Sequence, residues 1–147
     1  MNYLNNDLYN KSNGITEVQY LRFSKDEYRK LLNCGESDKE RLKYGQKLLN
    51  YLCDKYSIPR CHLRVADRPQ LSFSNGKTLG RYYPKIFKIE VFNLTAKTHK
   101  VVSIKSFTNT LIHEFIHHYD IEKLGFGKSP HTKGFYMRIS DLERKLS

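Results

Sequence analysis

The sequence predicts an α+β domain in which N-terminal helices precede a small, mostly antiparallel sheet and two further helices follow it. Apolar residues recur with a period of about 3.6 toward both ends of the chain, and with a period of two in its middle third. The 147 residues, of which 39% are hydrophobic, suffice for one globular domain with a buried core. Disordered and multidomain architectures are disfavoured.

Residues 1–14 are expected to be a flexible N-terminal arm, because five of them are Asn and few can join a core. A single domain would then occupy residues 15–147. Two capping boxes, Ser24 with Glu27 and Ser37 with Glu40, predict the starts of two helices. The second helix has its apolar positions on one stripe and cannot continue through a proline; these residues are Leu42, Leu49, Leu52, Tyr56 and Pro59.

Alternation of apolar and polar residues predicts strands in the middle of the chain. The apolar positions are Cys61, Leu63 and Val65, then Leu71 and Phe73, and finally Phe87, Ile89 and Val91. Asn75-Gly76 predicts a tight hairpin, because both residues tolerate positive φ angles, and the chain resumes as a strand over residues 79–83.

Helical periodicity returns from about Ile104 to Leu124 and stops at Gly125 and Gly127. A last helix toward the C-terminus is marked by Phe135, Ile139, Leu142 and Leu146.

The long helix contains the pattern HExxH, formed by His113, Glu114 and His117. Spacing i, i+4 places both imidazoles on one helix face, where they can share a metal ion. Glu114 is offset by about 100° and can reach a metal-bound water without ligating, which is the position of a general base. Imidazole ligands and an open coordination position favour Zn²⁺. We predict one zinc per chain.

A catalytic zinc needs a third protein ligand, and His131 is the preferred candidate. It follows the Gly-containing loop after the long helix, so the chain can fold back and present it to the other two histidines. The longer motif of the metzincins, in which HExxH is followed by a Gly and a third His, is absent. Asp120 and Lys123 stand at those two positions. Acidic alternatives for the third ligand are Glu122, Asp141 and Glu143.

The remaining histidines and the tyrosines have less specific roles. His118 is expected to be packed and hydrogen-bonded, and His62 and His99 to be surface or structural residues. Asp120 and Asn109 are near His113 in helical angle and are expected to orient the imidazoles. A phenol that stabilises an oxyanion could come from one of four tyrosines close to the motif in sequence or fold: Tyr82, Tyr83, Tyr119 and Tyr136.

The segments HEFIHHYD and PHTKGFYMRISDL, with the loop between them, resemble the SprT-like (Spartan-type) zinc metallopeptidases. The resemblance covers residues 71–146 and implies a zincin-like fold, with His113, His117 and His131 as zinc ligands and Glu114 as catalytic acid/base. Phe135 matches the aromatic residue after the third ligand, whereas Thr132 stands where the family often has Gly. Strand residues 80–83 and 89–91 look like the family's strand pair, whose exposed edge holds the substrate.

The function predicted from these features is zinc-dependent hydrolysis of peptide bonds in a protein or peptide substrate. The resemblance also implies a link to proteins associated with DNA. One alternative is a non-enzymatic, zinc-stabilised nucleic-acid-binding or regulatory module, although a purely structural site has no need of Glu114. A metal hydrolase acting on another bond is a second alternative.

The formal net charge is +11, with 26 Lys and Arg against 15 Asp and Glu. Between residues 60 and 105 there are ten basic residues and two acidic ones, so most of the surplus lies on the predicted sheet. These residues either form a solvated sheet face or bind phosphates near the zinc cleft. The nucleic-acid-binding candidates are Arg81, Lys85 and Lys88.

The three cysteines, Cys34, Cys53 and Cys61, fit neither a disulfide framework nor a four-cysteine zinc knuckle. No apolar run reaches the roughly 18 residues of a membrane span, and the Asn-rich start has no export signal. We therefore expect a cytoplasmic, intracellular monomer with no membrane partner.

Overall fold

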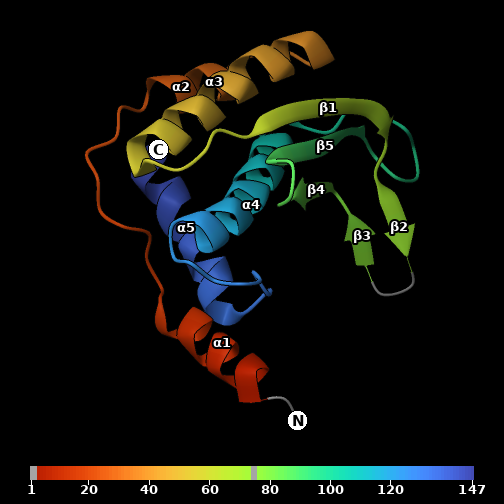
Figure 1. Ribbon diagram of the computed structural model, residues 1–147. Coiled ribbons are helices and arrows are strands. Elements are labelled where there is room, and N and C mark those ends of the chain that lie inside the picture. The colour runs from red at the N-terminus through yellow and green to blue at the C-terminus, as the bar shows by residue number, and fades with distance from the viewer. Residues whose placement is uncertain (1–2, 74–75) are drawn as a thin grey trace.

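The computed structural model describes residues 3–73 and 76–147 (Figure 1). This part of the chain forms an α+β fold with five helices, a three-stranded mixed sheet and a two-stranded hairpin. The helices are α1 (Tyr3–Gly14), α2 (Asp26–Leu32), α3 (Asp38–Tyr56), α4 (Ile104–Glu122) and α5 (Lys133–Leu146). The strands are β1 (His62–Pro69), β2 (Leu71–Phe73), β3 (Gly76–Thr78), β4 (Gly80–Tyr83) and β5 (Lys88–Leu94). None of the described helices is both long and apolar enough to cross a membrane.

The main sheet has the strand order β1-β5-β4 and differs from the predicted, mostly antiparallel sheet. β5 runs antiparallel to β4 but parallel to β1, with Leu63 opposite Ile89 and Val65 opposite Val91. Consecutive strands usually pair, and alternation alone does not say which strands become neighbours. Here β5 lies between β1 and β4, which makes the sheet mixed.

The predicted hairpin corresponds to β2 and β3, which pair antiparallel with Leu71 opposite Thr78. Asn75 lies outside the described residues. The strand expected over residues 79–83 is β4, which begins at Gly80. Phe87 precedes β5 and has a positive φ of 48°, so only Ile89 and Val91 of the predicted strand positions lie within β5.

The core lies between one face of the main sheet and helices α3 and α4. Gly45 of α3 makes this packing close, because a Cβ added there would lie 2.7 Å from Leu63 of β1 and 3.5 Å from Leu111 of α4. Figure 1 shows α4 running along the sheet, with α5 beside it. The predicted apolar positions of α5 are all buried, namely Phe135, Ile139, Leu142 and Leu146.

The helix starts are partly as predicted. Ser37 is the N-cap of α3 and accepts a hydrogen bond from the Glu40 backbone N–H, whereas the Glu40 carboxylate accepts from Gly35. Ser24 is not an N-cap, because α2 begins only after Lys25. Helix α3 ends at Tyr56, before Pro59, as expected. Of its predicted stripe, Leu42 is 40% exposed and lies outside the core.

The expected flexible arm over residues 1–14 is wrong for residues 3–14, which form α1. This helix lies beside α5, remote from the sheet (Figure 1). Its C-terminal end is held by polar contacts, because Ser12 is buried and Arg138 of α5 donates to the carbonyls of Ser12 and Ile15 at 2.7 and 2.6 Å. Apolar periodicity carries no signal for an attachment that a buried arginine makes.

Candidate metal centre

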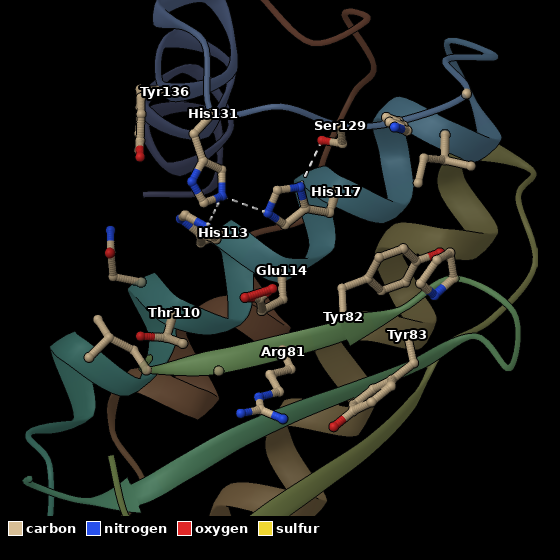
Figure 2. Close-up of a pocket in the computed structure, with 17 residues that line it drawn as sticks. Arg81, Tyr82, Tyr83, Thr110, His113, Glu114, His117, Ser129, His131 and Tyr136 are labelled. Atoms are coloured by element: carbon tan, nitrogen blue, oxygen red, sulfur yellow. Dashed lines mark hydrogen bonds between the residues drawn. The ribbon is translucent and has the colours of Figure 1, made fainter. Parts of the chain in front are cut away.

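Helix α4 carries the HExxH pattern on the side that faces β4 and the loop before α5 (Figure 2). Ser103 caps this helix by accepting a hydrogen bond from the Ser106 backbone N–H. His113 and His117 are one turn apart, and their ring centroids are separated by 5.1 Å. The helix itself therefore supplies two neighbouring imidazoles, as the spacing predicts.

His131 joins the two helix histidines, as predicted for the third ligand. Its Nε2 lies 3.3 Å from His113 Nε2 and 3.1 Å from His117 Nε2. Thr132 caps α5 immediately after it, accepting from the Phe135 backbone N–H at 3.0 Å. The buried Phe135 ring stacks on both His117 and His131, at centroid distances of 4.5 and 5.1 Å. The cap and the ring thus hold His131 in place.

The three nitrogens fit a zinc ion. In a tetrahedral site with Zn–N bonds of about 2.0–2.1 Å, two ligand nitrogens lie about 3.3–3.4 Å apart, close to the separations from His131. Burial, together with repulsion between the imidazoles, lowers the pKa of His113 to about 4 and that of His117 to about 3. Burial also lowers the pKa of His131. Neutral imidazoles are the form that binds metal.

Glu114 points from the same helix toward the space beneath the histidines (Figure 2). Its side chain is largely buried, and this burial raises the pKa of its carboxyl group to about 7. It is not among the converging ligand atoms, which come from the three histidines. A carboxylate in this position, close to a metal site but outside it, can exchange a proton near neutral pH.

A cavity of about 810 Å³ opens in front of these groups. It is walled by β4, α4, the loop before α5, and Tyr136 of α5. β4 forms an edge of the main sheet, since it pairs only with β5 among the described strands. The candidate metal group therefore lies at the side of a cavity that a strand edge also borders.

The acidic alternatives for the third ligand lie elsewhere. Asp141 is buried against Lys145 and accepts from the Val18 backbone N–H, and Glu143 accepts a hydrogen bond from Asn109. Among the described residues no hydrogen bond joins Asn109 to His113, so the predicted orienting contact is not formed. Glu122, at the C-terminal end of α4, is not part of the metal group.

Asp120 supports His117 instead of His113, and it does so through a residue that the sequence reasoning missed. Ser129 Oγ donates to Asp120 Oδ2 at 2.8 Å and lies 2.7 Å from His117 Nδ1. Asp120 also forms a buried ion pair with Arg138, at 2.8 Å. No motif marks a lone serine in the loop between α4 and α5, so no sequence signal identifies it.

His118 is packed and hydrogen-bonded, as predicted. Its Nδ1 lies 2.6 Å from the Tyr82 hydroxyl, and its Nε2 lies 2.6 Å from the Pro59 carbonyl oxygen. It also belongs to a second, wholly buried group of possible metal ligands with Cys53 and Cys61, which the sequence analysis did not foresee. Both ring nitrogens of His118 contact groups outside its candidate metal group, whereas the Nε2 atoms of the three histidines have only one another as partners among the described residues. His62 and His99 are exposed, as expected.

Of the four tyrosines considered, three line the cavity, but Tyr136 alone lies beside the histidines. Tyr119 is buried and accepts from the Gln19 backbone N–H, and Tyr82 is bonded to His118. Tyr83 points away from the histidines, whereas Tyr136 lies beside them (Figure 2). The Tyr136 ring centroid is 6.2 Å from that of His113 and 5.8 Å from that of His131.

The basic candidates lie around the sheet and not at the histidines. Arg81 is exposed and its side chain points away from the metal group (Figure 2). In the sheet register it is opposite Glu90, whose carboxylate forms ion pairs with Arg64 at 3.6 Å and Arg68 at 3.3 Å. Lys85 lies in the turn before β5 and is exposed. Lys88 lies at the start of β5 and is half-buried. Of these three residues, Arg81 is among those that line the cavity, and Lys85 and Lys88 are not.

The chain was compared with protein-family models, curated proteins and solved structures, and no match was found.

Proposed function

We propose that the protein is a zinc-dependent metallopeptidase. The observation that carries this proposal is the convergence of three neutral imidazole nitrogens beside Glu114, a buried carboxylate that stays outside the ligand set. A structural zinc site is normally closed by four protein ligands, whereas a catalytic site keeps one position open. Three histidines at the wall of a large cavity are typical of the second kind.

His113, His117 and His131 would hold the zinc through their Nε2 atoms. Zinc bound there supplies Lewis acidity, which polarises a scissile carbonyl and lowers the pKa of water toward 7. Glu114 accepts the proton of the attacking water and passes it to the nitrogen of the leaving amine. In the metal-free protein burial raises the pKa of Glu114 to about 7, and bound zinc would favour the ionised carboxylate that accepts the proton.

The edge of β4 suits an extended peptide as substrate. It borders the cavity, and a free strand edge offers backbone N–H and C=O groups to a segment that adds to the sheet. The resemblance to SprT-like metallopeptidases supports the same substrate class, and it suggests proteins associated with DNA. The basic residues of the sheet region are consistent with that suggestion.

The test combines metal analysis with peptide cleavage. Purified protein should contain about one zinc per chain, and His131→Ala should lose most of it. Glu114→Gln should keep the zinc and the fold but lose hydrolysis of an unstructured protein substrate, since an amide cannot accept the proton. Full zinc content without any cleavage by the wild type would instead favour the non-enzymatic zinc module. Cleavage by Glu114→Gln at the wild-type rate would exclude Glu114 as the base.

A further inference from the structure

We infer that Ser129 is a positioning residue of the metal centre, which fixes the tautomer and the ring orientation of His117. This inference rests on the proposed metal site. It is based on a chain of hydrogen bonds between four side chains, which runs from Arg138 through Asp120 and Ser129 to His117. Each contact in this chain is 3.0 Å or shorter.

The direction of every hydrogen bond in the chain follows from what each group can donate. An arginine only donates, so the Asp120 carboxylate accepts from Arg138 Nε at 3.0 Å and from Nη2 at 2.8 Å. The same carboxylate accepts the single proton of the Ser129 hydroxyl. Ser129 Oγ has then only lone pairs left for His117, and so His117 Nδ1 must carry the hydrogen. The lone pair of this imidazole is therefore on Nε2, the atom that faces His131.

The anchor of this chain is fully satisfied and shielded from water. Both Asp120 and Arg138 are 0% exposed. Beyond its two bonds to Asp120, Arg138 donates through Nη1 to the carbonyls of Ser12 and Ile15, and through Nη2 to Ser12 Oγ. All five guanidinium N–H groups thus have acceptors, which leaves the arginine no alternative arrangement. Because the Asp120 carboxylate is fixed, it also fixes the direction in which the Ser129 hydroxyl donates its hydrogen bond.

Of the three candidate ligands, His117 alone has an Nδ1 partner among the described residues. Second-layer partners of metal-binding histidines set the tautomer and raise ligand affinity, and their loss typically costs 10–100-fold in metal affinity. Ser129 lies in the loop that also carries His131, so the same contact ties this loop to α4. Two contacts hold this loop. Ser129 ties it to His117, and the Thr132 cap fixes it next to His131.

The test measures zinc affinity by competition with a chelating dye. Ser129→Ala should weaken zinc binding 10–100-fold. Ser129→Thr keeps the hydroxyl and should stay near the wild type. Ser106→Ala is the matched control, because Ser106 is exposed on the same helix as His117 and its side chain is outside the chain of contacts. Equal affinities for wild type and Ser129→Ala would overturn the inference.

A second measurement separates this inference from the proposed function. Nitrogen chemical shifts of the His117 ring in zinc-free protein report the tautomer directly. The wild type should show the Nδ1–H form, and Ser129→Ala a mixture of both forms in a protein with an unchanged circular dichroism spectrum. An Nε2–H form in the wild type would refute the role of Ser129, whether or not zinc binds. Absence of zinc binding by the wild type would refute the proposed metal site and with it the role of Ser129 toward a metal, whereas the His117 tautomer would still be decided by the chemical shifts alone.

Discussion

Gly80 of β4 packs directly against Glu114 of α4. A Cβ added at Gly80 would lie 3.5 Å from Glu114 Cγ, 2.9 Å from Thr110 Cγ2 and 2.8 Å from the Glu90 carbonyl oxygen. The distances to Thr110 and Glu90 are shorter than ordinary van der Waals contact. The Glu90 atom belongs to the backbone, so it cannot move away by a change of rotamer. The absence of a side chain at Gly80 therefore sets how closely the strand edge approaches the proposed general base.

Gly80→Ala should lower the free energy of unfolding by about 1–3 kcal/mol, because the added methyl group forces β4 away from α4. Peptide hydrolysis should fall as well, since the strand edge moves relative to Glu114. Urea unfolding measures the first effect. Gly14→Ala is the control, as a Cβ at Gly14 meets nothing within 4 Å. Equal losses in the two variants would refute the close-packing explanation.

The raised pKa of Glu114 predicts how the stability of the zinc-free protein depends on pH. Burial raises this pKa from its ordinary value of 4.5 to about 7, so the folded protein holds the proton more tightly than the unfolded chain. The resulting stabilisation is complete below pH 4.5 and is lost as the pH rises to about 7. Glu114→Gln cannot titrate and should gain up to about 3 kcal/mol relative to the wild type over that range.

Urea unfolding at several pH values in the presence of a chelator measures this difference. His113 and His117 have lowered pKa values and titrate in both proteins, so their contributions largely cancel in the comparison. Stability curves that stay parallel from pH 4.5 to 8 would show that Glu114 is not held in the protonated form by burial.

Tyr136 is predicted to stabilise developing negative charge on the substrate carbonyl oxygen. Its ring lies beside His113 and His131 at the cavity wall, and the residue is 49% exposed. Tyr136→Phe should lower kcat about 100-fold and leave zinc affinity unchanged. Tyr20→Phe removes a hydroxyl from a surface residue and should retain full activity. A wild-type kcat for Tyr136→Phe would assign the ring to packing alone.

The basic residues of the sheet region are predicted to bind nucleic-acid phosphates. Charge reversal of Arg81, Lys85 and Lys88 should weaken DNA binding but leave cleavage of a small peptide nearly intact, because the Arg81 side chain points away from the histidines. Affinity should fall with salt, with a slope of about −0.9 per phosphate contacted for duplex DNA and about −0.7 for single strands.

Reversal of three exposed lysines of α3, namely Lys39, Lys43 and Lys47, makes the same change in net charge at another surface. DNA binding that falls equally in both triple variants would indicate a general effect of charge. Binding that is undetectable at low salt would leave the sheet charges as a solvated face.

The part of the candidate site that lies on α4 could be predicted from sequence, because the arrangement of its residues depends only on their spacing along the helix. His113 and His117 share a face in any α-helix, and Glu114 is offset from them by the same geometry. The Ser37 cap and the buried stripe of α5 follow from equally local rules. His131 was predictable as a third ligand from its place after a short loop, but Asp141 and Glu143 could be set aside only once their partners were known.

The tertiary structure decided the features that depend on residues far apart in the chain. Strand β5 pairs with both β1 and β4, and alternation within a strand carries no information about its neighbours. The attachment of α1 depends on Arg138, which is 126 positions away from Ser12. Ser129 orients His117 only because the Asp120 carboxylate, which is paired with the buried Arg138, accepts the hydrogen bond of the Ser129 hydroxyl. Local hydrogen-bond and periodicity rules select the helices and place the two helix histidines on one face, whereas partners across the fold are selected by burial, which exists only after the chain has packed.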